Sequence, residues 1–166
     1  MMREGTYECV VHSSSAMDRL ADTLAPLLRS GDVMMLNGDL GAGKTRFVQG
    51  LAHALGVDDD VTSPTFTVQL VYDARDFPLY HFDLYRLGTA DDLEDVGYWE
   101  ALEGDGVTFI EWGDKFPDDT PEDYLETIIT VEDDLTRRMR VKAHGERSEE
   151  LLSLWADAAA DLQPIS

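Results

Sequence analysis

The sequence predicts an α/β domain in which a mixed sheet is flanked by helices and extended by an antiparallel C-terminal hairpin. Short apolar runs typical of strands alternate with segments whose apolar residues recur at helical spacing. A glycine-rich segment, residues 38–45, separates a buried-type strand from a helix. Near the end of the chain, two strand-like segments flank a short acidic turn, residues 132–134. The length of 166 residues predicts that residues 1–166 form a single domain.

The first elements are predicted from apolar spacing and capping residues. A strand is expected over residues 6–12, and the serines after it offer N-cap hydroxyls to a helix over residues 16–29. Residues 33–36 form an unbroken apolar run, typical of a strand covered on both faces. The next helix is predicted over residues 46–55 and ends at Gly56.

The later elements follow the same two periodicities, with Gly97 dividing a short acidic helical region and Ser148 predicted to cap the last helix. They are strands over 66–72, 78–84 and 107–110, helices over 89–96 and 98–102, hairpin strands over 125–131 and 135–143, and a last helix that ends at about residue 161.

The charge balance is strongly negative. The 34 aspartates and glutamates outnumber the 13 lysines and arginines, for a net charge of −21. Binding a nucleic-acid backbone directly needs many cations facing phosphates, and docking on an anionic membrane needs basic clusters, so both are disfavoured. Only Lys44, Lys115 and Lys142 are lysines. Two interpretations stay open, a surface adapted to high salt and an ordinary soluble acidic protein.

Cysteine content and hydropathy bear on the compartment. Cys9 is the only cysteine, so no internal disulfide forms, which suits a reducing compartment. Residues 1–11 contain no apolar stretch of signal-peptide length, and no run approaches the roughly 18 apolar residues of a membrane span. We therefore expect a cytoplasmic protein without membrane contact.

The glycine-rich segment matches the full phosphate-binding pattern G-x-x-x-x-G-K-[ST]. It consists of Gly38, Asp39, Leu40, Gly41, Ala42, Gly43, Lys44 and Thr45. The glycines let main-chain amides converge on phosphate oxygens, and the following helix aims its positive end at the same place. Lys44 supplies charge for the outer phosphates, Thr45 offers a hydroxyl to Mg²⁺, and Arg46 is added to the predicted nucleotide contacts. The segment therefore predicts a nucleoside-triphosphate site with Mg²⁺.

A second constellation, YHFDLYR, ends the predicted strand over residues 78–84. Strand alternation places His81 and Asp83 on one face. An acid that leaves an apolar strand can hold a water on Mg²⁺ or orient the attacking water. The alternative, a rim carboxylate paired with Arg86, stays open from the residues alone. We interpret His81, taken by itself, as structural.

Glu111 ends the apolar run of residues 107–110. A buried acid is costly unless a charged partner or a metal compensates it, so Glu111 is predicted to face a cation. The alternative is an exposed edge acid beside Trp112. In the loop T-S-P-T, residues 62–65, Thr65 is a candidate contact for the γ-phosphate or Mg²⁺ in a nucleotide-sensing switch. The alternative for this loop is a strand-entry turn made by Pro64.

Together these motifs resemble one family, TsaE, the P-loop ATPases of bacterial tRNA threonylcarbamoyladenosine biosynthesis. The resemblance covers about residues 16–141 and rests on GDLGAGKT, SPTF, HFDLYR and IEW, in family order and at family-like spacing. It implies a P-loop NTPase fold that binds ATP with Mg²⁺ and hydrolyses it slowly alone. It also implies TsaD-like and TsaB-like partners, which modify an adenosine of tRNA and which ATP turnover resets, so that this chain contacts tRNA only indirectly.

The resemblance also implies roles for single residues. Lys44, Asp83 and Glu111 would be the catalytic residues, with Asp83 acting near the γ-phosphate. Thr45 and Glu111 would hold Mg²⁺. Thr65 would lie in the first switch, and Trp112 would lie beside the metal-binding acid.

Three other functions share part of this pattern. A GTPase is disfavoured because the sequence lacks an N-K-x-D element, Asn37 being its only asparagine. A small-molecule kinase would use Asp83 and Arg86 on an acceptor hydroxyl, but it needs an arginine-rich lid. The only basic cluster, residues 137–140, lies in the predicted hairpin. Its arginines would approach the base or phosphates of the nucleotide, serve a partner or, by default, balance local acid. A nucleotide-gated interaction module would bind ATP with little turnover.

Overall fold

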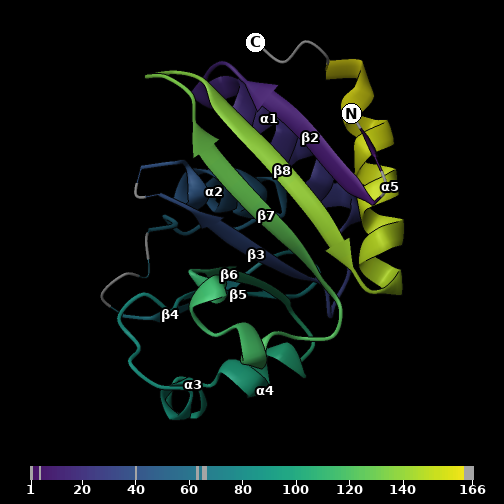
Figure 1. The fold of residues 1–166 in the computed structure, drawn as a ribbon. Helices are drawn as coiled ribbons and strands as arrows, with labels where there is room; N and C mark the ends of the chain where they lie inside the picture. Colours follow the sequence, from purple (N-terminus) through teal and green to yellow (C-terminus); the bar gives the residue numbers. More distant parts are fainter. Residues whose placement is uncertain (1, 4, 40, 63, 65–66, 163–166) are drawn as a thin grey trace.

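The computed structural model describes residues 2–3, 5–39, 41–62, 64 and 67–162, which form one eight-stranded sheet with helices on both faces (Figure 1). The strands are β1 (Met2–Arg3), β2 (Thr6–Val11), β3 (Val33–Gly38), β4 (Gln69–Asp73), β5 (Pro78–Asp83), β6 (Val107–Glu111), β7 (Tyr124–Val131) and β8 (Arg137–His144). The α-helices are α1 (Ser14–Leu24), α2 (Lys44–Ala54), α3 (Asp91–Asp95), α4 (Tyr98–Leu102) and α5 (Glu146–Ala159). Short 3₁₀ helices cover Ala25–Leu27, Gly113–Lys115, Pro117–Asp119 and Ala160–Leu162.

The sheet is mixed, with the strand order β1-β2-β8-β7-β3-β6-β5-β4. β3 runs parallel to β6 and β7, and β5 runs parallel to β6. β7 and β8 form an antiparallel hairpin, and β2 extends the sheet beyond it. The predicted α/β class, with a mixed sheet and an antiparallel C-terminal hairpin, is confirmed. Because β3, β5 and β6 are parallel, their carboxyl ends meet at one edge of the sheet, where ligands of such sheets bind.

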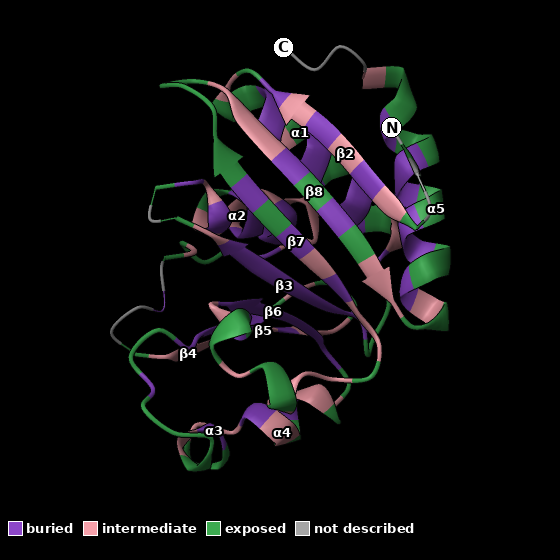
Figure 2. Cartoon of the chain, viewed as in Figure 1, coloured by how far each residue is buried: buried purple, intermediate pink, exposed green. Residues whose placement is uncertain are grey.

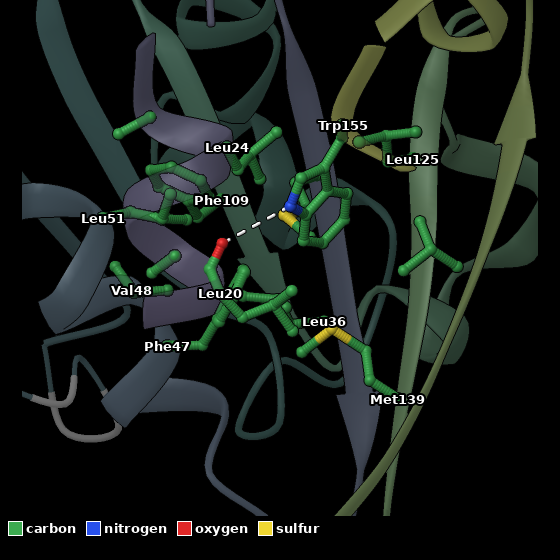
Figure 3. Packing of buried hydrophobic residues seen from close by; sticks show 14 of the residues in the cluster. Leu20, Leu24, Leu36, Phe47, Val48, Leu51, Phe109, Leu125, Met139 and Trp155 are labelled. Atoms are coloured by element: carbon green, nitrogen blue, oxygen red, sulfur yellow. Dashed lines mark hydrogen bonds between the residues drawn. The ribbon is translucent and has the colours of Figure 1, made fainter. Parts of the chain in front are cut away.

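The larger hydrophobic core lies between the sheet and α1, α2 and α5. Trp155 of α5 is fully buried, and its ring centroid lies 6.0 Å from that of Phe47 on α2 (Figure 3). The Trp155 indole N–H donates to the Thr23 hydroxyl at 3.0 Å, so its one polar atom is satisfied. Leu20 and Leu24 of α1 are fully buried beside it. This packing fixes α2, the helix that follows the glycine-rich loop, against the sheet.

A smaller core covers the opposite face of β3, β5 and β6, where α3 and α4 pack. Phe82 of β5 and Tyr98 of α4 are buried there, with an edge-to-face ring contact at 5.7 Å between centroids. β3 is buried over nearly all of its length, as an apolar strand between two helical layers should be (Figure 2).

Two helix ends differ from the sequence prediction for identifiable reasons. Ser13 caps the first helix, accepting from the Ala16 amide at 3.0 Å, but α1 ends at Leu24 and continues as a 3₁₀ turn that contains Pro26, which has no amide N–H to donate. The predicted cap of the last helix is wrong. The carboxylate of Asp123 accepts the Arg147 amide at 2.9 Å and also both the amide and the hydroxyl of Ser148, so the cap comes from a distant loop.

The strand bounds also shift by a few residues. β4 begins at Gln69, after Val68 at a left-handed φ of 67°, and β5 ends at Asp83. The two-residue strand β1 has no counterpart in the prediction. In the described ranges, no helix has both the length and the apolar character that a bilayer crossing requires.

Candidate functional site

The glycine-rich loop joins β3 to α2 at the edge where the parallel strands end. In the strand register Leu36 of β3 pairs with Glu111 of β6, and Glu111 pairs with Asp83 of β5. The two acids therefore stand side by side at the ends of neighbouring strands. The loop that begins at Gly38 leaves β3 at the same level, which brings together segments that are far apart in the sequence.

Two glycines of the loop have backbone positions that other residues do not fit. Gly38 has a φ of 141°, and a Cβ added there would lie 2.4 Å from the carbonyl oxygen of Ile129. Gly43, the N-cap of α2, has a φ of 109°, and among the described residues no side chain caps the helix at this position. The first amides of a helix have no partner within the helix, so those of α2 are available to an anion.

Lys44 is nearly buried, with 5% of its surface exposed. Its Nζ donates to the Gly38 carbonyl oxygen at 2.5 Å and lies 4.1 Å from the centroid of the Trp112 ring. Burial lowers the pKa of the Lys44 ammonium, while the nearby carboxylates of Glu111 and Asp83 oppose that shift. The Lys44 ammonium is thus held over the face of the Trp112 ring and against the main chain of the glycine-rich loop.

Glu111 is 3% exposed, and in the part of the chain that the structure describes two polar side chains from different elements contact it. Thr45 of α2 donates its hydroxyl to Glu111 Oε2 at 3.2 Å, and His81 Nε2 lies 2.6 Å from the same oxygen. The alternative of an exposed edge acid is therefore excluded, since Glu111 is buried. Asp83, also 3% exposed, accepts the Tyr85 amide on Oδ1 at 3.0 Å.

The oxygens of Thr45 and Glu111 suit Mg²⁺. Two ligand oxygens in adjacent octahedral positions, each about 2.1 Å from Mg²⁺, lie roughly 3.0 Å apart. The observed separation of Thr45 Oγ1 and Glu111 Oε2 is 3.2 Å. The described ranges contain no cluster of three or more His, Cys, Asp or Glu side chains suited to a metal. Mg²⁺ held by one or two protein groups together with substrate phosphates is the usual arrangement at phosphate-transfer sites.

The family model described as "Threonylcarbamoyl adenosine biosynthesis protein TsaE" matches residues 11–139. The chain belongs to the TsaE family. It is 42% identical over 139 residues to a tRNA threonylcarbamoyladenosine biosynthesis protein TsaE of Treponema pallidum, covering 84% of this chain and 95% of that protein. The TsaE protein of Bacillus subtilis is 40% identical over 132 residues, which cover 80% of this chain and 82% of that protein.

A solved structure has the same fold. The crystal structure of Bacillus subtilis YdiB matches with a TM-score of 0.78 and 30% sequence identity, covering 95% of this chain and 98% of that one. The family resemblance stated from four short motifs therefore extends over nearly the whole chain. The α/β arrangement of this TsaE-family protein is that of a P-loop NTPase.

The remaining predicted contacts divide into two groups. Asp39, Gly41, Ala42 and Arg46 lie in the loop and the first turn of α2, where Arg46 forms an exposed ion pair with Asp18 of α1. Leu40, Ser63, Thr65 and Phe66 lie outside the described residues, so the switch loop and its Thr65 stay predictions.

The structure places Arg137 against the glycine-rich loop, a contact that the default prediction for the basic cluster did not include. Arg138 and Arg140 pair with Glu8, which is the charge balance expected by default for the cluster. Arg137 instead donates to main-chain carbonyls, including that of Gly41 at 3.4 Å. Its place at the start of β8, opposite Val11 of β2, brings a guanidinium to the glycine-rich loop of this TsaE-family chain.

Proposed function

We propose that this chain is a Mg²⁺-dependent ATPase of tRNA threonylcarbamoyladenosine biosynthesis, a single P-loop domain over residues 1–166. One observation carries the proposal. At one sheet edge a nearly buried lysine, a hydroxyl donor and two buried carboxylates converge beneath a glycine-rich loop, in the set Lys44, Thr45, Asp83 and Glu111. Membership of the TsaE family supports this role.

The loop would bind the triphosphate of ATP through main-chain amides and the amino end of α2. Lys44, now bonded to the Gly38 carbonyl, would exchange that partner for the outer phosphates, where its charge counts most. Thr45 and Glu111 would hold Mg²⁺, which neutralises the β- and γ-phosphates when it is bound. Two further cations lie next to the proposed triphosphate position. They are Arg46 in the first turn of α2 and Arg137 beside Gly41.

Asp83 is proposed to act on the water. In hydrolysis the water oxygen attacks the γ-phosphorus, the bond from that phosphorus to the bridging oxygen breaks, and ADP and phosphate leave. A carboxylate at this edge can accept a hydrogen bond from the water and so orient it. Asp83 is the acid in register with Glu111, on the neighbouring strand, which suits it to the water rather than to the metal.

The proposed partners are TsaD-like and TsaB-like proteins, whose complex ATP turnover would reset. A net charge of −21 suits an ATPase that docks on proteins and reaches tRNA only through them. Membership of a tRNA-modification family favours work in the cytoplasm.

The test is phosphate release from ATP, measured for the chain alone and with its two candidate partners and tRNA, with and without Mg²⁺. We expect slow Mg²⁺-dependent release that the partners accelerate. A small-molecule kinase would release no free phosphate without an acceptor. An interaction module would form no ADP in a single-turnover experiment even with the partners present. Either of these two results would overturn the proposal.

A further inference from the structure

His81 lies in the interior of the site and contacts one of the proposed Mg²⁺ ligands. Its side chain is fully buried on β5. In the β5–β6 register His81 pairs with Phe109, so Glu111 lies two residues further along the neighbouring strand and on the same face. Across this diagonal His81 Nε2 lies 2.6 Å from Glu111 Oε2. An apolar side chain would fill the same buried space, so packing alone does not account for a histidine at this position.

The surroundings of the ring determine which nitrogen carries the proton. Nε2 faces a carboxylate oxygen at 2.6 Å, a distance that two facing lone pairs do not tolerate, so Nε2 carries a hydrogen. Nδ1 is buried and has no hydrogen-bond partner within the described ranges. We therefore place a hydrogen on Nε2, from which His81 donates one hydrogen bond to Glu111.

The same Glu111 oxygen has a second donor whose contact cannot persist beside a bound cation. The Thr45 hydroxyl donates to Oε2 at 3.2 Å. When that hydroxyl turns a lone pair to a cation, its hydrogen points away from the cation and from the carboxylate that shares it. Of the two hydrogen bonds that described residues donate to Oε2, the one from His81 is then left to hold the carboxylate in place.

We propose that His81 is a positioning residue that holds the Glu111 carboxylate beside Thr45 in the arrangement that binds Mg²⁺. This inference rests on the proposed function, since it takes Mg²⁺ to be bound by Thr45 and Glu111. Groups that hydrogen-bond to metal ligands typically change metal affinity about 10- to 100-fold when they are removed. The interpretation of His81 as merely structural is thereby replaced by a defined role.

The test measures Mg²⁺ binding separately from catalysis. ADP is titrated by calorimetry into the wild-type protein and its variants at a series of MgCl₂ concentrations, and again in EDTA. His81→Leu removes the N–H and fills much of the same buried space with an apolar side chain. In this variant we expect the Mg²⁺ concentration that gives half of the Mg²⁺-dependent change in ADP affinity to rise about 10- to 100-fold. The ADP affinity in EDTA should be unchanged. His81→Gln places an amide N–H near the position of Nε2 and should recover most of the shift.

Phe82→Leu is the matched control, because Phe82 is the fully buried neighbour on the opposite face of β5. It should lower stability and leave the Mg²⁺ midpoint unchanged. A wild-type midpoint in folded His81→Leu overturns the inference. If that variant does not fold, His81→Asn, whose shorter amide does not reach Glu111, replaces it with the same expected shift. If wild-type binding of ADP itself does not depend on Mg²⁺, the proposed function fails first, which distinguishes the two failures.

Discussion

Lys44→Met separates the charge of the loop lysine from its packing. Lys44 is 5% exposed, and its amino group lies 4.1 Å from the centroid of the Trp112 ring while donating to the Gly38 carbonyl. Methionine is unbranched and adapts to irregular gaps, so it keeps the contact with Trp112. The substitution therefore removes the cation and little else.

We expect the affinity for ATP to fall about 10- to 150-fold. A hydrogen bond to a charged group contributes about 1.5–3 kcal/mol, and each 1.4 kcal/mol is a factor of ten in the dissociation constant. The upper end of this range fits the site, because Glu111 and Asp83 are both nearly buried beside Lys44. Without Lys44, the two carboxylates remain beside the phosphates of ATP, and the cation that offset their charge is gone.

Calorimetry of a non-hydrolysable ATP analogue, at a fixed Mg²⁺ concentration, measures this change. Lys142→Met is the control, since Lys142 lies exposed on β8 and its loss changes the net charge of −21 by the same single unit. The control should bind as the wild type does. If folded Lys44→Met also binds the analogue with wild-type affinity, the assignment of the loop as a phosphate site is refuted.

Three further predictions concern the acid, the last helix and the cysteine. Asp83→Asn should bind ATP normally and lose most of its turnover, and full turnover in a phosphate-release assay would make Asp83 a structural acid. Arg147→Ala breaks a two-bond pair with Asp32, whose side chain is 5% exposed, and should lower the free energy of unfolding by about 3 kcal/mol in urea titrations with an unchanged m-value. Burial raises the pKa of the Cys9 thiol to about 11, so the reactive thiolate is scarce at pH 8. A chromogenic disulfide reagent should therefore modify Cys9 at pH 8 only on unfolding, and rapid reaction of the native protein would contradict this.

Much of the fold was predictable because its signals are local. Apolar runs identified the strands, and Ser13 identified the start of the first helix, since a hydroxyl caps amides only two or three residues away. The start of the last helix was mispredicted because its cap is Asp123, which lies 24 and 25 residues before the amides that it accepts. A sequence window around Ser148 contains no sign of this partner.

The candidate site shows the same division. The segment that contains Lys44 and Thr45 was recognisable because its residues act together within one loop. The contacts His81–Glu111 and Arg137–Gly41 join residues 30 and 96 positions apart, so they follow only from the strand order and register. The alternation of β5 did predict that His81 and Asp83 share a face, but not which group on β6 they would meet.

The strand register, more than the geometry of the loop, places Asp83 and Glu111 side by side in this site. Glu111 lies level with Leu36 on one side and with Asp83 on the other, so the three parallel strands end at the same level and two of them place an acid there. A slip of β5 by one residue would turn His81 and Asp83 to the opposite face. Phe82 opposes that slip, because its ring is fully buried in the smaller core against Tyr98. An apolar residue between the two polar ones, whether phenylalanine or the leucine of Phe82→Leu, therefore keeps both polar side chains on the face of the sheet that carries Glu111.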